Sequence, residues 1–185
     1  MIDDVFNNAK DRMTKAVEAL RRELATIRTG RAHPGLVEHL RVDYYGVPTP
    51  LNQLATITVP DPRLLTIQPW DRQAMGAIEK AILKSDLSLT PTNDGTIIRL
   101  SIPQLTEERR RELVKVVHKK VEEGRVEVRN IRRDGHDELR RLQREKLIAE
   151  DDQFRGQEKL QKLTDEFVQQ VEHLGGEKEA ELLAV

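Results

Sequence analysis

The chain of 185 residues contains no cysteine, only 3% aromatic residues, and no proline outside one central segment. Without cysteine there is no disulfide framework, no thiolate metal site and no cysteine nucleophile. The first residues carry neither the basic segment nor the apolar run of a signal peptide, and no apolar run reaches membrane-spanning length. We therefore expect a cytoplasmic protein without membrane contact.

Catalytic motifs are also missing. The five histidines are scattered, and no pair of them stands four residues apart on a helix with a third ligand. There is no phosphate-binding glycine loop, no nucleophile elbow and no dinucleotide fingerprint. Asp134, Asp137 and Glu138 surround Gly135, but the spacing of a calcium loop is absent. We therefore expect no enzyme, no metal site and no bound cofactor.

What the chain has in abundance is charge, on 34% of its residues. The formal net charge of -1 conceals a polarity along the sequence. Residues 105–146 hold 14 basic and 10 acidic side chains, a net charge of +4. Residues 147–185 hold 4 basic and 10 acidic side chains, a net charge of -6. This polarity predicts a directed electrostatic partner.

Three long segments repeat apolar or small residues at steps of three and four, a pattern typical of amphipathic helices. They are residues 2–28, residues 105–148 and the segment that follows Asp151-Asp152. The seam positions are Ile2, Phe6, Ala9, Met13, Ala16, Leu20, Leu24 and Ile27; Val117, Val121, Gly124, Val128, Ile131, Gly135, Leu139 and Leu142; and Leu160, Leu163, Phe167, Val171, Leu174 and Leu182. Each helix alone would expose its seam, so the three predict a bundle.

The central segment differs in composition, since all eight prolines lie in it. Short runs of β-forming residues predict strands at residues 37–44, 55–59, 64–68 and 96–102. Asp71 is placed to cap a helix that buries Met75, Ile78 and Ile82, and residues 93–95 predict a tight turn. We therefore predict an α+β fold in which a small domain, residues 31–104, is inserted into a bundle formed by residues 1–30 and 105–185. The two connections, near Gly30-Arg31 and Gln104-Leu105, predict a hinge.

A basic stripe lies beside the seam of the second helix, within roughly a third of its circumference at 100° per residue. Its members are Arg111, Lys115, His118, Arg125, Arg129, Arg132, Arg133, His136 and Arg140. One interpretation is contact with the phosphate backbone of a structured nucleic acid, since guanidinium groups suit bidentate phosphate contacts. The other is a solvated helix face crossed by pairs such as Arg133–Asp137 and Arg141–Glu145.

Two further alternatives stay open on the residues alone. The cationic stretch 105–146 could pair with the anionic stretch 147–185 of a second copy, which would make the protein a self-associating scaffold. Gly124 and Gly135 on the seam could mark either a close approach between helices or a tolerated local weakness.

The heptapeptide Val128-Arg129-Asn130-Ile131-Arg132-Arg133-Asp134 resembles the ribosome recycling factors. Further blocks similar to that family follow in its order and spacing, and together they span most of the chain. They are residues 28–32, 45–46, 50–53, 68–71, 85–87, 93–99 and 105–110. The chain departs from the family's pattern at Gly124 and Gly135, where alanine is common, and at Ser88, where glycine is frequent.

The resemblance implies an L-shaped, two-domain protein: an elongated three-helix bundle with a small inserted β/α/β domain. It implies a monomer that binds the post-termination ribosome and, with elongation factor G, splits it into subunits, releasing mRNA and deacylated tRNA. GTP would be hydrolysed by that partner. Residues Arg28, Arg110, Arg129, Arg132 and Arg133 would contact large-subunit ribosomal RNA across the tRNA sites, Arg132 foremost. The inserted domain would swing at Gly30, Arg31, Gln104 and Leu105.

Overall fold

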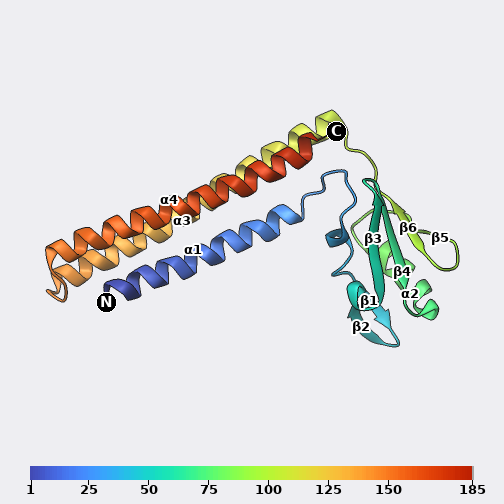
Figure 1. The fold of residues 1–185 in the computed structure, drawn as a ribbon, viewed down its shortest axis with the longest axis horizontal. Helices are drawn as coiled ribbons and strands as arrows, with labels where there is room; N and C mark the ends of the chain where they lie inside the picture. The colour runs from blue at the N-terminus through green and yellow to red at the C-terminus, as the bar shows by residue number, and fades with distance from the viewer. Residues whose placement is uncertain (185) are drawn as a thin grey trace. The chain divides into compact units, whose positions relative to one another are not determined.

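A computed structural model describes residues 1–184, which divide into two compact units. One unit comprises Met1–Ile27 and Glu107–Val185, and the other comprises Arg28–Thr106 (Figure 1). The first unit is helical, and the second holds all the strands, so the predicted α+β combination of a helical bundle with a small inserted domain is confirmed.

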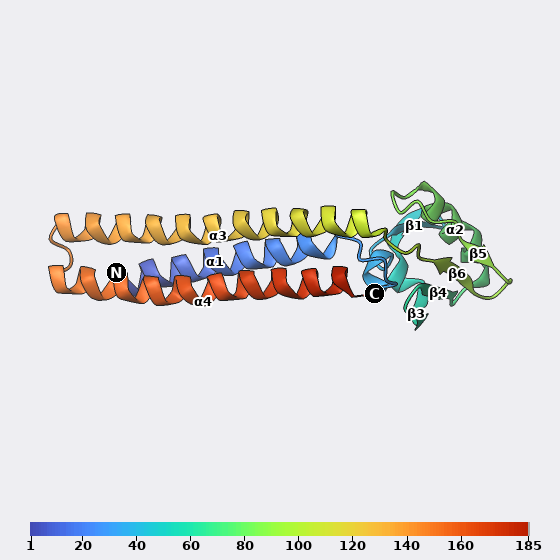
Figure 2. The same ribbon diagram turned by 90° about the horizontal axis from the view of Figure 1, so that it is seen from above.

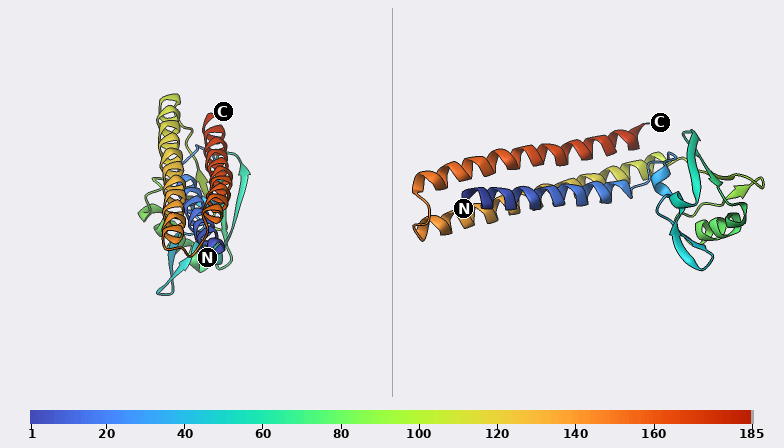
Figure 3. Two further views of the ribbon diagram at one scale, coloured as in Figure 1. Left: turned by 90° about the vertical axis from the view of Figure 1, so that its left-hand side faces the viewer. Right: turned by 60° about the horizontal axis from the view of Figure 1, so that its bottom comes forward.

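The helical unit consists of α1 (Ile2–Ala25), α3 (Glu107–Arg144) and α4 (Glu150–Leu183). The three helices run alongside one another (Figures 2 and 3). Every predicted seam position is buried or half-buried, and the α4 seam is buried at all six positions. The three seams therefore form one continuous core, as the periodicity predicts.

The first helix is shorter than predicted. It ends at Ala25, where the Thr26 hydroxyl donates to the Glu23 carbonyl at 2.6 Å. The Ile27 amide donates to the Leu24 carbonyl at 3.1 Å, so the last turn tightens and the helix stops. Arg28 consequently lies beyond the helix, in the second unit.

Glycines on the α3 seam allow the neighbouring helices to approach closely. A Cβ atom built on Gly124 would lie 3.2 Å from Leu20 Cδ2 of α1 and 3.3 Å from Val171 Cγ1 of α4. A Cβ atom built on Gly135 would lie 2.8 Å from Leu160 Cδ1 of α4. Helix α3 continues without interruption through both positions, so close approach is the physical reason for these glycines.

The turn between α3 and α4 places Lys146 in the left-handed region, with φ of +60°. The Lys146 amide donates to the Gln143 carbonyl and the Leu147 amide to the Leu142 carbonyl, each at 2.9 Å. These two bonds define a Schellman motif, in which glycine is the preferred residue at the left-handed position. Lysine at this position carries backbone strain.

Replacing Lys146 with glycine should therefore stabilise the protein by about 0.5–1 kcal/mol. Urea unfolding measures the change as a rise in the midpoint at constant slope. The matched control is Lys146→Ala, which removes the same side chain but keeps a Cβ atom and should bring no such gain. Equal midpoints for the glycine and alanine variants would show that the turn carries no strain.

The second unit contains a four-stranded antiparallel sheet and a separate hairpin. The sheet has the order β3 (Ala55–Asp61), β4 (Leu64–Pro69), β6 (Ile98–Ser101), β5 (Thr92–Asn93), and the hairpin pairs β1 (Arg41–Tyr44) with β2 (Val47–Pro50). Short 3-10 helices occupy Pro34–Leu36, Leu51–Gln53 and Arg72–Ala74. The core of this unit is a continuous cluster of buried aliphatic residues, including Leu65, Ile67, Ile98 and Leu100.

The predicted strand at residues 37–44 is correct only for its second half. The amide of Glu38 donates to the Pro34 carbonyl at 3.0 Å, and His33 Nδ1 accepts from the Gly35 amide at 2.9 Å. Residues 34–39 therefore turn, and Val37 is buried without belonging to a strand. Strands β2 and β5 were not predicted, because β2 carries two prolines and β5 has only two residues.

Helix α2 (Met75–Lys84) follows the 3-10 turn that Asp71 caps. Asp71 Oδ1 accepts from the Gln73 amide at 2.9 Å, and Met75, Ile78 and Ile82 are buried, as predicted. The pKa of the Asp71 carboxyl is lowered, first by this amide and then by the Tyr44 hydroxyl.

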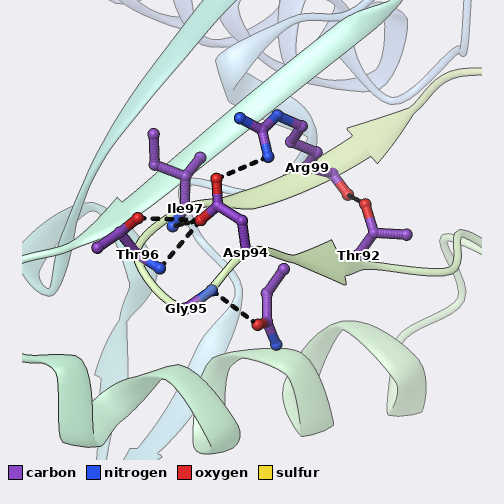
Figure 4. A network of polar contacts seen from close by, with 7 residues as sticks. Thr92, Asp94, Gly95, Thr96, Ile97 and Arg99 are labelled. Carbon is purple, nitrogen blue, oxygen red and sulfur yellow. Dashed lines mark hydrogen bonds and ion pairs between the residues drawn. The ribbon is translucent and has the colours of Figure 1, made fainter.

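The predicted turn at residues 93–95 is organised by Asp94 (Figure 4). Its Oδ1 accepts from the Thr96 and Ile97 amides at 3.0 and 2.9 Å, and its Oδ2 accepts from Arg99 at 2.9 Å. These donors hold the pKa of the Asp94 carboxyl well below its usual range, the Ile97 amide contributing most. Because the Thr96 and Ile97 amides are used in the turn, β6 starts only at Ile98.

Ser88 also has a positive φ, of +55°. This backbone conformation favours glycine, which is the residue frequent at this place in the family that the sequence resembles. The departure at Ser88 therefore concerns backbone strain in a loop.

Candidate nucleic-acid interface

Half of the ten arginines of α3 are paired with carboxylates. Five of them take part: Arg109 with Glu112 at 2.9 Å, Arg111 with Glu107 at 2.6 Å, Arg125 with Glu122 and Glu172 at 2.7 and 3.2 Å, Arg140 with Asp137 at 3.5 Å, and Arg141 with Glu138 and Glu145 at 2.6 and 2.9 Å. The pKa of Arg141 is raised, chiefly by its hydrogen bond to Glu138. For these residues, including three of the predicted stripe, the interpretation as a solvated face with ion pairs holds.

Arg129, Arg132 and Arg133, which we call the arginine cluster, are neighbours on α3 and differ from these five. None of them forms an ion pair with a carboxylate among residues 1–184. Arg129 and Arg133 are exposed, and Arg132 is half-buried with one hydrogen bond, from its Nη1 to Gln161 Oε1 of α4 at 3.0 Å. The cluster therefore presents guanidinium groups without carboxylate partners in the described part of the chain, and Arg132 lies where α3 meets α4.

Two acidic residues close to the cluster in sequence are engaged elsewhere. Asp134 accepts from Arg12 of α1 at 2.9 Å, and Asp137 pairs with Arg140. The pair Arg133–Asp137 considered from the sequence is thus not formed, whereas Arg141–Glu145 is. Because Asp134 is paired with Arg12, its carboxylate does not neutralise the arginine cluster, and the local charge stays positive.

His136 lies between Arg132 and Arg140 on the same helix edge. Its pKa is lowered, first by burial and then by the charge of Arg132; a backbone hydrogen bond at Gln157 opposes the shift. Its Nε2 is buried and has no hydrogen-bond partner within residues 1–184. His136 is consequently neutral near pH 7, and the charge of the cluster comes from arginine alone.

A model of the ribosome recycling factor family matches residues 20–183. The ribosome-recycling factor of Carboxydothermus hydrogenoformans is 58% identical over 185 residues, covering 100% of both chains. That of Roseiflexus sp. (strain RS-1) is 59% identical over the same span, again with 100% coverage of both. The chain belongs to the ribosome recycling factor family.

Solved recycling-factor structures share the fold. A solution structure of the ribosome recycling factor is 46% identical and has a TM-score of 0.84, covering 100% of this chain and 98% of its own. A second match, with 47% identity, full coverage of both chains and a TM-score of 0.69, comes from models for the T. thermophilus ribosome recycling factor and the E. coli elongation factor G bound to the E. coli post-termination complex.

The remaining arginines predicted for this recycling-factor chain do not join the cluster. Arg110 is half-buried near the start of α3. It stands 22 residues before Arg132, or roughly 33 Å along the helix at 1.5 Å per residue. Arg28 lies beyond α1, and its guanidinium donates to the Leu87 and Asp86 carbonyls at 2.5 and 2.8 Å. The Arg28 side chain thus stabilises the loop before β5 by hydrogen bonds to its backbone.

The residues predicted as the recycling-factor hinge meet within the second unit. Gly30 has φ of +76°, and a Cβ atom built there would lie 3.1 Å from Leu105 Cγ and 3.2 Å from the Leu105 amide nitrogen. Arg31 and Gln104 line a small cavity together with these two residues. The incoming and outgoing connections therefore pack against each other, and glycine is needed where they touch.

Gln161, the α4 partner of Arg132, was not predicted, because the helical spacing of α3 says nothing about which α4 side chain faces it. No group of three or more potential metal ligands is found among the described residues. No helix within residues 1–184 is long and apolar enough to cross a membrane.

Proposed function

We propose that this chain binds the post-termination ribosome and, together with elongation factor G, splits it into subunits, releasing mRNA and deacylated tRNA. Membership of the family supports this function, as does the relative bound with elongation factor G to a post-termination complex. The observation that carries the mechanism is the arginine cluster, which has no carboxylate partners among the described residues although α3 is rich in them.

In this mechanism the cluster anchors the bundle on phosphates of large-subunit ribosomal RNA. Arg132 is the leading contact, with Arg129 and Arg133 beside it, because guanidinium forks bind phosphate oxygens in pairs. Arg110 and Arg28 would add contacts outside the cluster. The second unit would swing at Gly30, Arg31, Gln104 and Leu105 when the translocase pushes it, transmitting force to the contacts between subunits.

The chain would act by binding and leverage, without a catalytic reaction or cofactor of its own. GTP hydrolysis belongs to elongation factor G in this scheme, and we propose a monomer that works in the cytoplasm beside the ribosome. The charge polarity suggested a scaffold in which residues 105–146 pair with residues 147–185 of a second copy. Contacts between these two stretches form within one chain instead, since Arg125 and His118 of α3 contact Glu172 and Glu179 of α4.

Light scattering of post-termination ribosomes tests the function. Mixing them with this protein, elongation factor G and GTP should lower the scattering as subunits separate, and omission of any one component should prevent the fall. A recycling factor of known activity, run with the same translocase, is the control. If that control splits ribosomes and this chain does not, the proposed activity is wrong.

A further inference from the structure

Side chains along the contact between α3 and α4 follow a regular register. His118 Nε2 lies 3.1 Å from Glu179 Oε2, and Arg125 Nε lies 3.2 Å from Glu172 Oε1. From the first pair to the second, the position moves seven residues forward on α3 and seven residues backward on α4, as expected for antiparallel helices. One more step of seven places Arg132 opposite Asp165.

Arg132 nevertheless forms no ion pair with Asp165. Gln161 stands between the two: Arg132 Nη1 donates to Gln161 Oε1 at 3.0 Å, and Gln161 Nε2 donates to Asp165 Oδ1 at 2.9 Å. A neutral amide can serve both neighbours, because it has one acceptor end and one donor end. Gln161, four residues before Asp165 on α4, thus accepts the hydrogen bond that the carboxylate of Glu172 accepts from Arg125 at the previous step of the register.

We propose that Gln161 is a positioning residue for Arg132, holding the guanidinium at the α3–α4 line while keeping it out of an ion pair with Asp165. The charge of Arg132 then stays without a carboxylate partner, and its remaining N–H donors are free for phosphate. Arg125, at the previous step of the register, pairs directly with Glu122 and Glu172, so its positive charge is neutralised by carboxylates. This inference deepens the proposed function and rests on the RNA contact of the arginine cluster.

The first test is Gln161→Met, which keeps the length of the side chain and removes its amide. Arg132 should then pair with Asp165, and the affinity for isolated large ribosomal subunits should fall roughly tenfold, the order of one charge-assisted hydrogen bond. The slope of log affinity against log salt should drop by about one. Adding Asp165→Asn should restore affinity and slope, because the competing carboxylate is gone.

A purely structural role for Gln161 would not be rescued by Asp165→Asn, so failure of the rescue overturns the proposal, as does wild-type affinity of Gln161→Met. Gln169→Met, an exposed glutamine on the same helix, is the control and should bind as the wild type does. If the wild-type chain itself does not bind large subunits, the proposed function fails. A crystal structure of Gln161→Met then decides the positioning role: Arg132 beside Asp165 supports it, and Arg132 in its original place refutes it.

Discussion

Replacement of Arg132 by glutamate is expected to weaken binding to large ribosomal subunits at least roughly tenfold. A charge-assisted hydrogen bond contributes about 1.5–3 kcal/mol, and the new carboxylate would additionally repel phosphate. The slope of log affinity against log salt should fall by about one for each phosphate group that the variant no longer neutralises. Equilibrium binding at several salt concentrations measures both quantities.

The matched control is Arg155→Glu on α4, which changes the net charge equally. Arg155 is exposed and pairs with Asp151 in its own helix at 2.7 Å, so its guanidinium already has a carboxylate partner. This variant should bind nearly as the wild type does. An unchanged affinity and salt slope for Arg132→Glu, with the thermal midpoint retained, would remove Arg132 from the interface.

Two adjacent glycines of α4 should respond to alanine with opposite signs. A Cβ atom on Gly175 would overlap Val121 Cγ2 of α3, whereas a Cβ atom on Gly176 would meet nothing within 4 Å. Val121 is 5% exposed and branched at Cβ, so it has little freedom to move aside. We expect Gly175→Ala to destabilise the protein by about 1–2 kcal/mol, as overpacking of a core does.

Gly176→Ala should instead stabilise the protein by about 0.5–1 kcal/mol, because alanine loses less backbone entropy in a helix. The two variants differ only in which face of α4 they occupy, so intrinsic helix propensity cancels in the comparison. Urea unfolding midpoints measure both effects. Stabilisation by both variants would show that Val121 can move aside for the methyl group of alanine at position 175.

Patterns local to one helix or turn were sufficient for much of the fold. The steps of three and four identified the three core seams, and Asp71 and Asp94 identified a cap and a turn, because these features depend on neighbours a few residues away. Val37 misled the strand prediction, since a buried aliphatic side chain in a turn has the same signature as one in a strand. Strand β2, with its two prolines, forms through its partner β1 and has little signal of its own.

The amino-acid sequence by itself determined the helical bundle, the inserted α+β segment and the presence of an arginine-rich stripe on the second long helix. Only the tertiary structure decided which arginines keep their charge unpaired. Arg125 meets Glu172, Arg132 meets Gln161, and Asp134 is taken by Arg12. These partners lie 29 to 122 residues apart in the chain. The physical reason is that helical spacing sets the face on which a side chain lies, whereas packing of the three helices sets the group that it meets.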